Sequence, residues 1–173
     1  DGAPVIYNNI IRSNGGIAIK AIKNATVSFN TIGGAAANHG NVGAAIQNGK
    51  NILNNTIIKN GAGAILADAS NNAVVKDNVI TDNPGFGIQN GKTILNNTIN
   101  NSDASLVATR STNAIKADAD ATVSGNTITN NMGYGISGGK IITDNTIVIN
   151  VAANPAVTGT VVANYAITAT ANT

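Results

Sequence analysis

The hexapeptide Ile52-Leu53-Asn54-Asn55-Thr56-Ile57 decides the fold, because its pattern occurs seven times along the chain. The pattern is an aliphatic residue, two free positions, Asn, one free position and Ile. Its copies occupy residues 6–11, 27–32, 52–57, 75–80, 94–99, 123–128 and 142–147. Every copy keeps all three fixed positions, so the remaining sequence forms spacers between equivalent units.

The asparagines at the centre of the copies form a candidate structural ladder. They are Asn9, Asn30, Asn55, Asn78, Asn97, Asn126 and Asn145. Their spacings of 21, 25, 23, 19, 29 and 19 residues fall in the range of roughly 20 to 50 residues that is typical of solenoids. Strand residues alternate between faces, so the aliphatic residue and the Ile of each copy can both point inward across a bend. Stacked coils would place like residues about 4.8 Å apart and let the Asn amides hydrogen-bond along the axis.

The spacers predict a third short strand in each unit. A second Asn follows the ladder Asn by five residues in five copies, and Ala35 and Ser102 replace it in the other two. The five are Asn14, Asn60, Asn83, Asn131 and Asn150. A Gly-rich turn and a short apolar stretch such as Gly63-Ala64-Ile65 come next. Each coil is therefore expected to hold three short strands, and the longer spacers at 33–43 and 102–113 are expected to bulge as loops.

A longer repeat is superimposed on the first. Ile32, Ile80 and Ile128 are evenly spaced, 48 residues apart, and the segments before them resemble one another. The intervening units have a shorter turn that ends in Lys50, Lys92 or Lys140, three residues that could form a thin basic stripe. Two kinds of turn should therefore alternate along one edge. Such a doubled repeat suits a surface with regular spacing better than a single catalytic pocket.

The composition excludes several classes of protein. The chain has 173 residues, enough for one domain, and no Cys, so it has neither a disulfide framework nor a thiolate metal site. Aromatic residues make up 3% and charged residues 10%, whereas 30 residues are Asn. The formal net charge of +2 is too small and scattered to indicate a nucleic-acid partner. No apolar run approaches the roughly 18 residues of a membrane span.

These features resemble the right-handed parallel β-helix of the pectate-lyase-like superfamily. The resemblance covers residues 5 to about 150, and its clearest signs are the Asn-Thr-Ile tripeptides at Asn30, Asn55, Asn97, Asn126 and Asn145. It implies an all-β, right-handed parallel β-helix of about seven coils. Residues 1–150 would form the repeats, and residues 151–173 a strand-like C-terminal cap or exchanged segment. That family includes polysaccharide lyases and hydrolases, epimerases, phage tailspikes, adhesins and structural surface proteins, so the resemblance leaves the function open.

Candidate catalytic residues are few. Enzymes of the resembled family use clustered carboxylates, and two carboxylates must reach one bond for acid–base work. The only close pair is Asp118 and Asp120, in a turn that matches the one holding Asp68. Asp is favoured in turns because its side chain bonds to the backbone, and we expect that role here. His39, the single His, is expected to be a solvated loop residue. The sequence therefore predicts no catalytic residue, no cofactor and no metal site.

A column of threonines is expected on the outer surface. Thr31, Thr56, Thr98, Thr127 and Thr146 each follow a ladder Asn. A flat Thr array could bind ice or carbohydrate, although Ile10 and Val79 interrupt this one. We interpret it as ordinary solenoid surface.

The ends of the predicted solenoid suggest self-association. Nothing before Ile6 has the pattern of a cap, and the tail after Asn150 is itself strand-like. We expect an uncapped end on which another subunit stacks, or which continues in a longer chain. The leading hypothesis is a non-enzymatic structural protein, extracellular or at the cell surface, that forms homo-oligomers or polymers. The alternative is a carbohydrate-binding or carbohydrate-cleaving β-helix, such as a tailspike or lyase fragment, with a polysaccharide as its partner.

Overall fold

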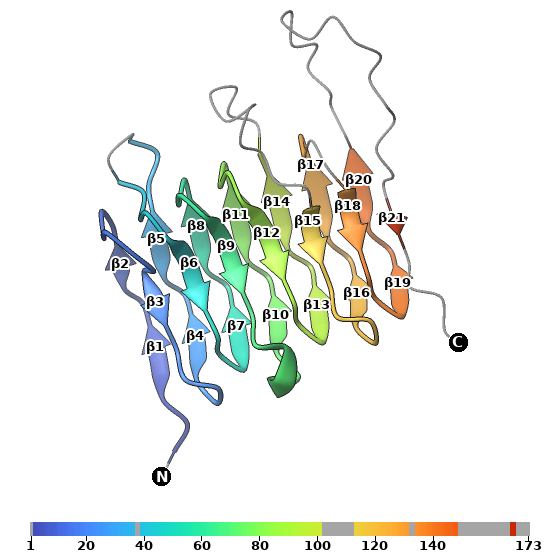
Figure 1. Ribbon diagram of the computed structural model, residues 1–173, viewed down its shortest axis with the longest axis horizontal. Coiled ribbons are helices and arrows are strands. Elements are labelled where there is room, and N and C mark those ends of the chain that lie inside the picture. The colour runs from blue at the N-terminus through green and yellow to red at the C-terminus, as the bar shows by residue number, and fades with distance from the viewer. Residues whose placement is uncertain (1, 37–38, 102–112, 132–133, 149–166, 169–173) are drawn as a thin grey trace, which may run out of the picture.

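The computed structural model describes residues 2–36, 39–101, 113–131, 134–148 and 167–168. Within these ranges the chain winds into a solenoid of three parallel sheets, each with seven strands (Figure 1). Each strand pairs in parallel with its equivalents one coil before and one coil after. The prediction of an all-β parallel helix with about seven coils is confirmed.

The three sheets form the three sides of the solenoid. Sheet A contains β1 (Val5–Tyr7), β4 (Thr26–Ser28), β7 (Asn51–Leu53), β10 (Val74–Lys76), β13 (Thr93–Leu95), β16 (Thr122–Ser124) and β19 (Ile141–Thr143). Sheet B contains β2 (Ile10–Ile11), β5 (Thr31–Gly33), β8 (Thr56–Ile58), β11 (Val79–Thr81), β14 (Thr98–Asn100), β17 (Thr127–Thr129) and β20 (Thr146–Val148). Sheet C contains β3 (Ile19–Lys20), β6 (Ala44–Gln47), β9 (Gly63–Leu66), β12 (Phe86–Gln89), β15 (Asn113–Lys116), β18 (Tyr134–Ser137) and β21 (Ile167–Thr168). Coil 1 is thus β1–β3, and coil 7 is β19–β21.

The repeated hexapeptide forms the corner between sheets A and B. In coil 3, Ile52 at the centre of β7 and Ile57 at the centre of β8 are fully buried, and Asn55 between them is buried as well. The strand register places Val75 beside both Ile52 and Ile94, so aliphatic residues stack along the axis. Burying an aliphatic side chain of this size contributes roughly 1.5–3 kcal/mol. The fixed aliphatic positions therefore build the core one coil at a time.

The first turn, which joins sheet A to sheet B, requires a left-handed residue just before each ladder Asn. The residues there are Asn8, Phe29, Asn54, Asp77, Asn96, Gly125 and Asp144, with φ between 54° and 67°. Asn, Asp and Gly tolerate this conformation better than other residues do. Phe29 is the one bulky exception among the seven.

The third turn, which joins sheet C to sheet A, alternates between short and long forms as predicted. The short turns use two successive left-handed residues, such as Asn48 and Gly49 with φ of 64° and 105°. The long turns span residues 21–25, 67–73 and 117–121, and the second contains the 3-10 helix η1 (Ala69–Asn71). The first long turn reaches over the intervening short turn, because the Lys23 Nζ donates a hydrogen bond of 2.9 Å to the Ser70 hydroxyl. This contact joins two long turns that are two coils apart.

The remaining predictions concern loops and the tail. A loop connects β5 to β6, as expected for residues 33–43, although residues 37–38 lie outside the described ranges. The second predicted loop, 102–113, lies outside them except for its last residue. In the tail, β21 pairs in parallel with β18 and is the seventh strand of sheet C. The rest of the predicted cap or exchanged segment, residues 151–166 and 169–173, is not among the described residues.

Candidate functional site

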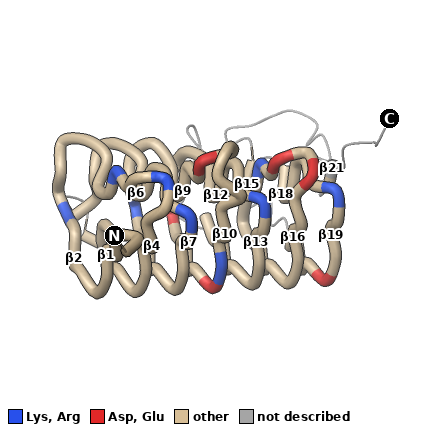
Figure 2. Tube along the Cα trace, turned by 90° about the horizontal axis from the view of Figure 1, so that it is seen from below, with Lys and Arg blue, Asp and Glu red and all other residues tan. Residues whose placement is uncertain are grey.

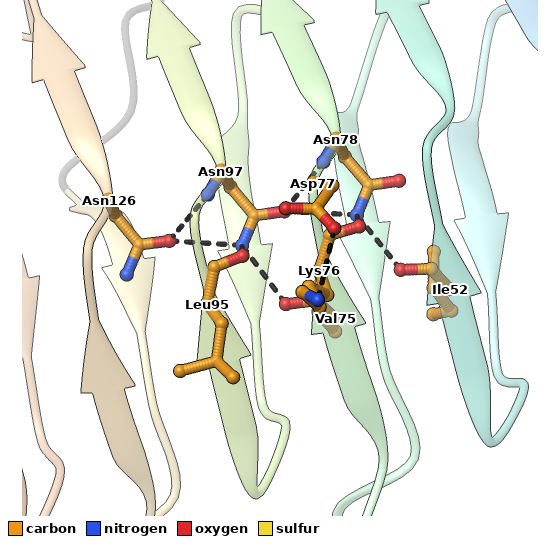
Figure 3. A network of polar contacts seen from close by, with 8 residues as sticks. All are labelled: Ile52, Val75, Lys76, Asp77, Asn78, Leu95, Asn97 and Asn126. Carbon is orange, nitrogen blue, oxygen red and sulfur yellow. Dashed lines mark hydrogen bonds and ion pairs between the residues drawn. The ribbon is translucent and has the colours of Figure 1, made fainter.

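The first asparagine ladder runs along the inside of the first turns. Figure 3 shows its centre, where the backbone N–H and Nδ2 of Asn97 donate to Oδ1 of Asn126 at 2.9 and 3.0 Å. The same Nδ2 lies 3.0 Å from the carbonyl oxygens of Val75 and Leu95. In turn, Oδ1 of Asn97 accepts hydrogen bonds from the N–H and Nδ2 of Asn78. Each buried amide is thereby satisfied on both sides.

The pattern repeats from one end of the solenoid to the other. Hydrogen bonds between side chains join all seven predicted asparagines in order, from Asn9 to Asn145. Each interior ladder Asn donates to the ladder Asn of the next coil and accepts from that of the previous coil, whereas Asn9 only donates along the ladder and Asn145 only accepts. Each hydrogen bond contributes about 1 kcal/mol, and a buried amide left without partners costs more. The ladder therefore makes each coil depend on its two neighbours.

A second ladder lies at the turn between sheets B and C. Side-chain bonds join Asn14 to Asn41, Asn41 to Asn60, and Asn60 to Asn83. Asn101 is bonded in the same way to Asn131. The prediction that Ala35 and Ser102 take the place of this Asn in two coils is therefore wrong.

A loop insertion hid Asn41, and the absence of one residue between strand and Asn hid Asn101. The second coil inserts its loop before the Asn, so counting five residues forward from the ladder Asn leads to Ala35. Counting three residues backward from the first residue of β6 finds Asn41, just as the same count from β9 finds Asn60. In the fifth coil the Asn comes four residues after Asn97 rather than five. The remaining predicted member, Asn150, lies outside the described residues.

The second ladder is interrupted in its middle. Among the described residues, Oδ1 of Asn101 is buried and accepts no hydrogen bond. On the other side of the gap, Asn83 Nδ2 donates to the carbonyl oxygens of Thr81 and Ile57, as Asn60 Nδ2 does to those of Ile58 and Ile32, but to no described ladder Asn. The first ladder, by contrast, has no such gap, and it is the continuous polar element of the fold.

Asp68 has the structural role expected of it. It caps η1, where its carboxylate accepts hydrogen bonds from the Ser70 hydroxyl at 2.7 Å and the Ser70 N–H at 2.9 Å. These bonds, helped by the Lys23 ammonium 3.7 Å away, hold the pKa of Asp68 below its usual range despite an opposing contribution from burial. A carboxylate with a lowered pKa is a weaker base, and this one is engaged in holding two long turns together.

The predicted carboxylate pair also lies in a turn. Asp120 is exposed and forms an ion pair with Lys92. The Asp118 backbone carbonyl accepts hydrogen bonds from the N–H groups of Ala121 and Gly139, both at 3.1 Å. The backbone of His39 bonds to Ser13 and Ala36 within a loop. In the ranges that the structure describes, no group of three or more Asp or His residues could hold a metal ion.

Charged residues alternate along the edge formed by the third turns. Figure 2 shows basic and acidic segments mixed along this edge rather than a row of one sign. Lys50, Lys92 and Lys140 occupy the short turns, and acidic residues occupy the second and third long turns between them. The ion pair of Lys92 with Asp120 further divides the predicted basic stripe.

Coil 1 leaves the N-terminal end of the core open. A depression there is lined by Ile6, Asn9, Ile10, Ile11, Ala18, Ile19 and Lys20. Ile6 and Ile11 occupy core positions but are only partly buried, and Ile10 and Val5 are 71% and 63% exposed. Oδ1 of Asn9 accepts no hydrogen bond from any residue of the described part of the chain, since the ladder bonds of Asn9 all use its donors.

Coil 7 presents the complementary end of the ladder. Asn145 Oδ1 accepts from Asn126, and its Nδ2 donates to the carbonyl oxygens of Val123 and Thr143. No described residue accepts a hydrogen bond from its backbone N–H, which in the interior coils donates to the next ladder Asn. Ile142 and Ile147 are partly buried, as their equivalents are in coil 1.

An aromatic pair lies beside the open end. The rings of Tyr7 in coil 1 and Phe29 in coil 2 meet edge to face, with centroids 5.5 Å apart. Their side chains remain 58% and 54% exposed. The left-handed φ of 56° at Phe29 is unfavourable for a bulky residue, and the ring contact, worth roughly 0.5–1.5 kcal/mol, offsets part of that strain.

The outer face of sheet B carries the predicted threonine column. The strand register places Thr31 beside Thr56, Thr98 beside Thr127, and Thr127 beside Thr146. Val79 occupies the equivalent position in coil 4 and Ile10 in coil 1, so the column is interrupted as the sequence indicates.

Comparisons with known proteins place this chain in a family. A search of curated proteins and a search of solved structures each find no match. Within the described residues there is no helix long and apolar enough to cross a membrane. A family model described as a right-handed β-helix region matches residues 1–152, the part of the chain in which three parallel sheets and an Asn ladder form. The chain therefore belongs to the family of right-handed β-helix proteins.

Proposed function

We propose that this chain is a non-enzymatic structural protein that assembles with copies of itself, outside the cell or at its surface. The observation that carries the proposal is the regular stack of coils, which share one strand register and one continuous Asn ladder and so present a surface of fixed spacing. In coil 1 the core residues Ile6 and Ile11 are incompletely buried, and the ladder residue Asn9 is exposed. Both features disappear in the interior coils, where a neighbour lies on each side.

An uncovered solenoid end is a strong driving force for association. Apolar interior and unpaired strand groups are both exposed there, and soluble solenoids normally cover them. Covering apolar surface contributes about 25 cal/mol per Å², and pairing two strand edges adds backbone hydrogen bonds. Two carboxylates are engaged in contacts within the turns, because Asp68 bonds to Ser70 and Asp120 is paired with Lys92. These contacts support the non-enzymatic part of the proposal.

The test is electron microscopy and light scattering of the purified 173-residue chain at neutral pH. We expect regular rods or filaments whose length grows with protein concentration. A protein that stays strictly monomeric at high concentration contradicts the proposal. Labelling of intact cells with an antibody tests the location separately.

A matched pair of lysine substitutions sharpens this test. Ala18 lines the depression at the open end, so Ala18→Lys places a charge where a second copy would dock. Ile22 is exposed in the first long turn and does not line the depression, so Ile22→Lys adds the same charge elsewhere. We expect only Ala18→Lys to abolish assembly. Equal assembly of both variants would show that the open end is not the contact.

Carbohydrate binding is the second candidate function, and the exposed pair of Tyr7 and Phe29 favours it. Aromatic faces held in a fixed arrangement can stack against sugar rings, and nearby Asn amides can bond to hydroxyl groups. The variant Phe29→Asn places at this turn the residue found at the equivalent Asn54, so the fold should tolerate it. If the pair binds polysaccharide, the wild-type chain retains a glycan on an array and Phe29→Asn loses it. Absence of binding across a broad panel would eliminate this function.

A further inference from the structure

We propose that Asn54 and Asn96 carry N-linked glycans, so that sugar chains project from the corner between sheets A and B. The sequence offers four Asn-x-Ser/Thr acceptor motifs, which begin at Asn24, Asn54, Asn96 and Asn100. Their surroundings in the structure differ, and these differences select two of the four. The inference rests on the proposed location outside the cell, because N-linked glycans are attached outside the cytosol.

The side chains of Asn54 and Asn96 can each accept a sugar without losing a contact. Both residues are exposed at the left-handed position of the first turn, with φ of 54°. No described residue forms a hydrogen bond with either side-chain amide. Beside Asn96 the next coil has Gly125, where a Cβ would collide with Oδ1 of Asn96, so the glycine makes room for this side chain.

The hydroxyl group that completes each motif also lies on the outer surface. Thr56 and Thr98 are the first residues of β8 and β14, in the outward-facing threonine column. Within the described ranges neither hydroxyl takes part in a hydrogen bond. The middle residue of each motif is a buried ladder Asn, Asn55 or Asn97. The acceptor amide and the hydroxyl therefore face outward on the two sides of one corner.

The other two motifs are engaged in contacts of the fold. Asn100 is only partly exposed, and its Oδ1 accepts a hydrogen bond of 2.9 Å from Nδ2 of Asn130. Asn24 is exposed, but Oγ1 of Thr26, the hydroxyl of its motif, accepts from Nδ2 of Asn51 at 3.3 Å. The geometry therefore favours the two corner residues, which lie two coils, roughly 10 Å, apart along the axis.

Phe29 supplies a surface for the first sugar at Asn54. It occupies the equivalent corner position one coil earlier, where its N–H donates to the Leu53 carbonyl oxygen at 3.2 Å, so the two side chains begin about 4.8 Å apart. The ring is 54% exposed, and the left-handed backbone is unfavourable for a bulky residue. An exposed ring beside a glycosylated Asn packs against the apolar face of the first sugar, which gives this strained residue a function.

The modification needs a donor that the chain does not supply. The donor is an oligosaccharide joined through a phosphate group to a membrane lipid, and a transferase outside the cytosol catalyses the reaction. Nδ2 of the Asn forms a bond to C1 of the first sugar as the bond between C1 and the phosphate breaks. The lipid phosphate leaves, and one amide proton is released. The side chain keeps its carbonyl oxygen and one N–H.

The test is mass spectrometry of peptides from the protein purified from the cells that make it. We expect the peptides that contain Asn54 and Asn96 to carry a sugar mass. Unmodified Asn54 and Asn96, or equal occupancy at Asn100, overturn the proposal. If antibody labelling of intact cells nevertheless detects the chain at the surface, the proposed location stands and only the glycans are excluded. If labelling and glycans are both absent, both proposals fail.

Two conservative variants, secreted by a cell line that attaches N-linked glycans, separate the motif from the fold. Thr56→Val places in coil 3 the residue that coil 4 has at Val79, so the fold should be kept while the glycan on Asn54 is lost and that on Asn96 remains. Ile10→Thr completes a motif that begins at Asn8, which is exposed at the same corner, and should add a glycan there. Retention of the glycan on Asn54 in Thr56→Val would contradict the assignment.

The contact with Phe29 is tested by thermal unfolding. Phe29→Gly places at this corner the residue that coil 6 has at Gly125, and it creates no new motif. The wild type and the variant are each made with glycans and, in a host that lacks the transferase, without them. We expect glycosylation to raise the melting temperature of the wild type by more than that of Phe29→Gly. Equal shifts overturn the contact with Phe29 and leave the two glycans in place.

Discussion

Coil 3 and coil 1 contain the same hexapeptide pattern but differ in how completely they bury it. In coil 3 the two isoleucines and the ladder Asn are buried, whereas in coil 1 the equivalent isoleucines are half-buried and Asn9 is exposed. The pattern therefore specifies the shape of a coil, and the neighbours on either side supply its burial. Stability in such a solenoid is a sum of interfaces between coils, so the same substitution should have different effects at different positions along the axis.

The largest expected effect is the introduction of a charge into the interior ladder. Asn97→Asp keeps the oxygen that accepts from Asn78 but replaces the Nδ2 donor to Asn126, Val75 and Leu95 with a carboxylate oxygen, so that a buried charge faces three oxygens. An uncompensated buried charge should lower the free energy of unfolding by at least about 3 kcal/mol. Urea denaturation at pH 7 measures it.

The adjacent residue gives the matched control. Asn96 is exposed in the left-handed turn position, which is occupied by Asp77 and Asp144 in other coils. Asn96→Asp should change the free energy of unfolding by no more than about 0.5 kcal/mol. Similar losses for both variants would mean that the ladder does not stabilise the fold.

Truncation of the same core position in two coils sharpens the comparison directly. Ile57→Ala removes a fully buried side chain and should cost about 3 kcal/mol, within the usual range for such cavities. Ile11→Ala removes its partly buried equivalent in coil 1 and should cost roughly half as much. Both are measured by urea denaturation at a concentration too low for assembly.

Raising the protein concentration tests the same pair in the assembled state. If a second copy covers coil 1, the cost of Ile11→Ala should rise toward that of Ile57→Ala as filaments form. A cost that does not depend on concentration would place the contact elsewhere.

A smaller effect is expected from the left-handed residue of the first turn. Asn54 has φ of 54°, a conformation that Ala adopts at a cost of roughly 1 kcal/mol. Asn54→Ala should therefore lower the melting temperature, and Asn54→Gly should leave it nearly unchanged. A reversal of this order would indicate that the Asn side chain, rather than the backbone, is what the turn requires.

The smallest expected effect is the pH dependence due to Asp68. Its pKa is lower in the folded chain than in the unfolded one, so its contribution to stability is present above the unfolded pKa of about 3.9. That contribution is lost as the pH falls below this value and through the folded pKa. Comparing Asp68→Asn with the wild type from pH 7 down to pH 2 should show two stability curves that converge only at the acid end. Parallel curves would contradict the assignment.

The repeated hexapeptide made the fold predictable, because each of its fixed residues has one physical task that recurs in every coil. An aliphatic residue such as Ile52 must face the core, and Asn55 must bond to both neighbouring coils. The first ladder was found in full for this reason. Asn41 was missed because a loop precedes it in the sequence, and Asn101 because it follows β14 directly, without the residue that separates β11 from Asn83.

Features that depend on the shape of the turns were not accessible from the sequence. The contact of Lys23 with Asp68 and Ser70 needs one long turn to reach over a short one, and side-chain spacing alone does not give that reach. The strained pair of Phe29 and Tyr7 was missed for a similar reason. Phe29 stands where six other coils have Asn, Asp or Gly, and aligning the seven copies at this position would have revealed it.

The coil length has a mechanical consequence. Each coil contributes about 4.8 Å to the length of the rod, but it contains between 19 and 29 residues from one ladder Asn to the next. An extended chain spans roughly 3.4 Å per residue, so a coil pulled off the end of the rod releases on the order of 65 to 100 Å of slack. Because each coil contacts mainly its neighbours, tension along the axis should release coils one at a time from the ends. A filament of this protein would then extend many-fold before its backbone carried the load.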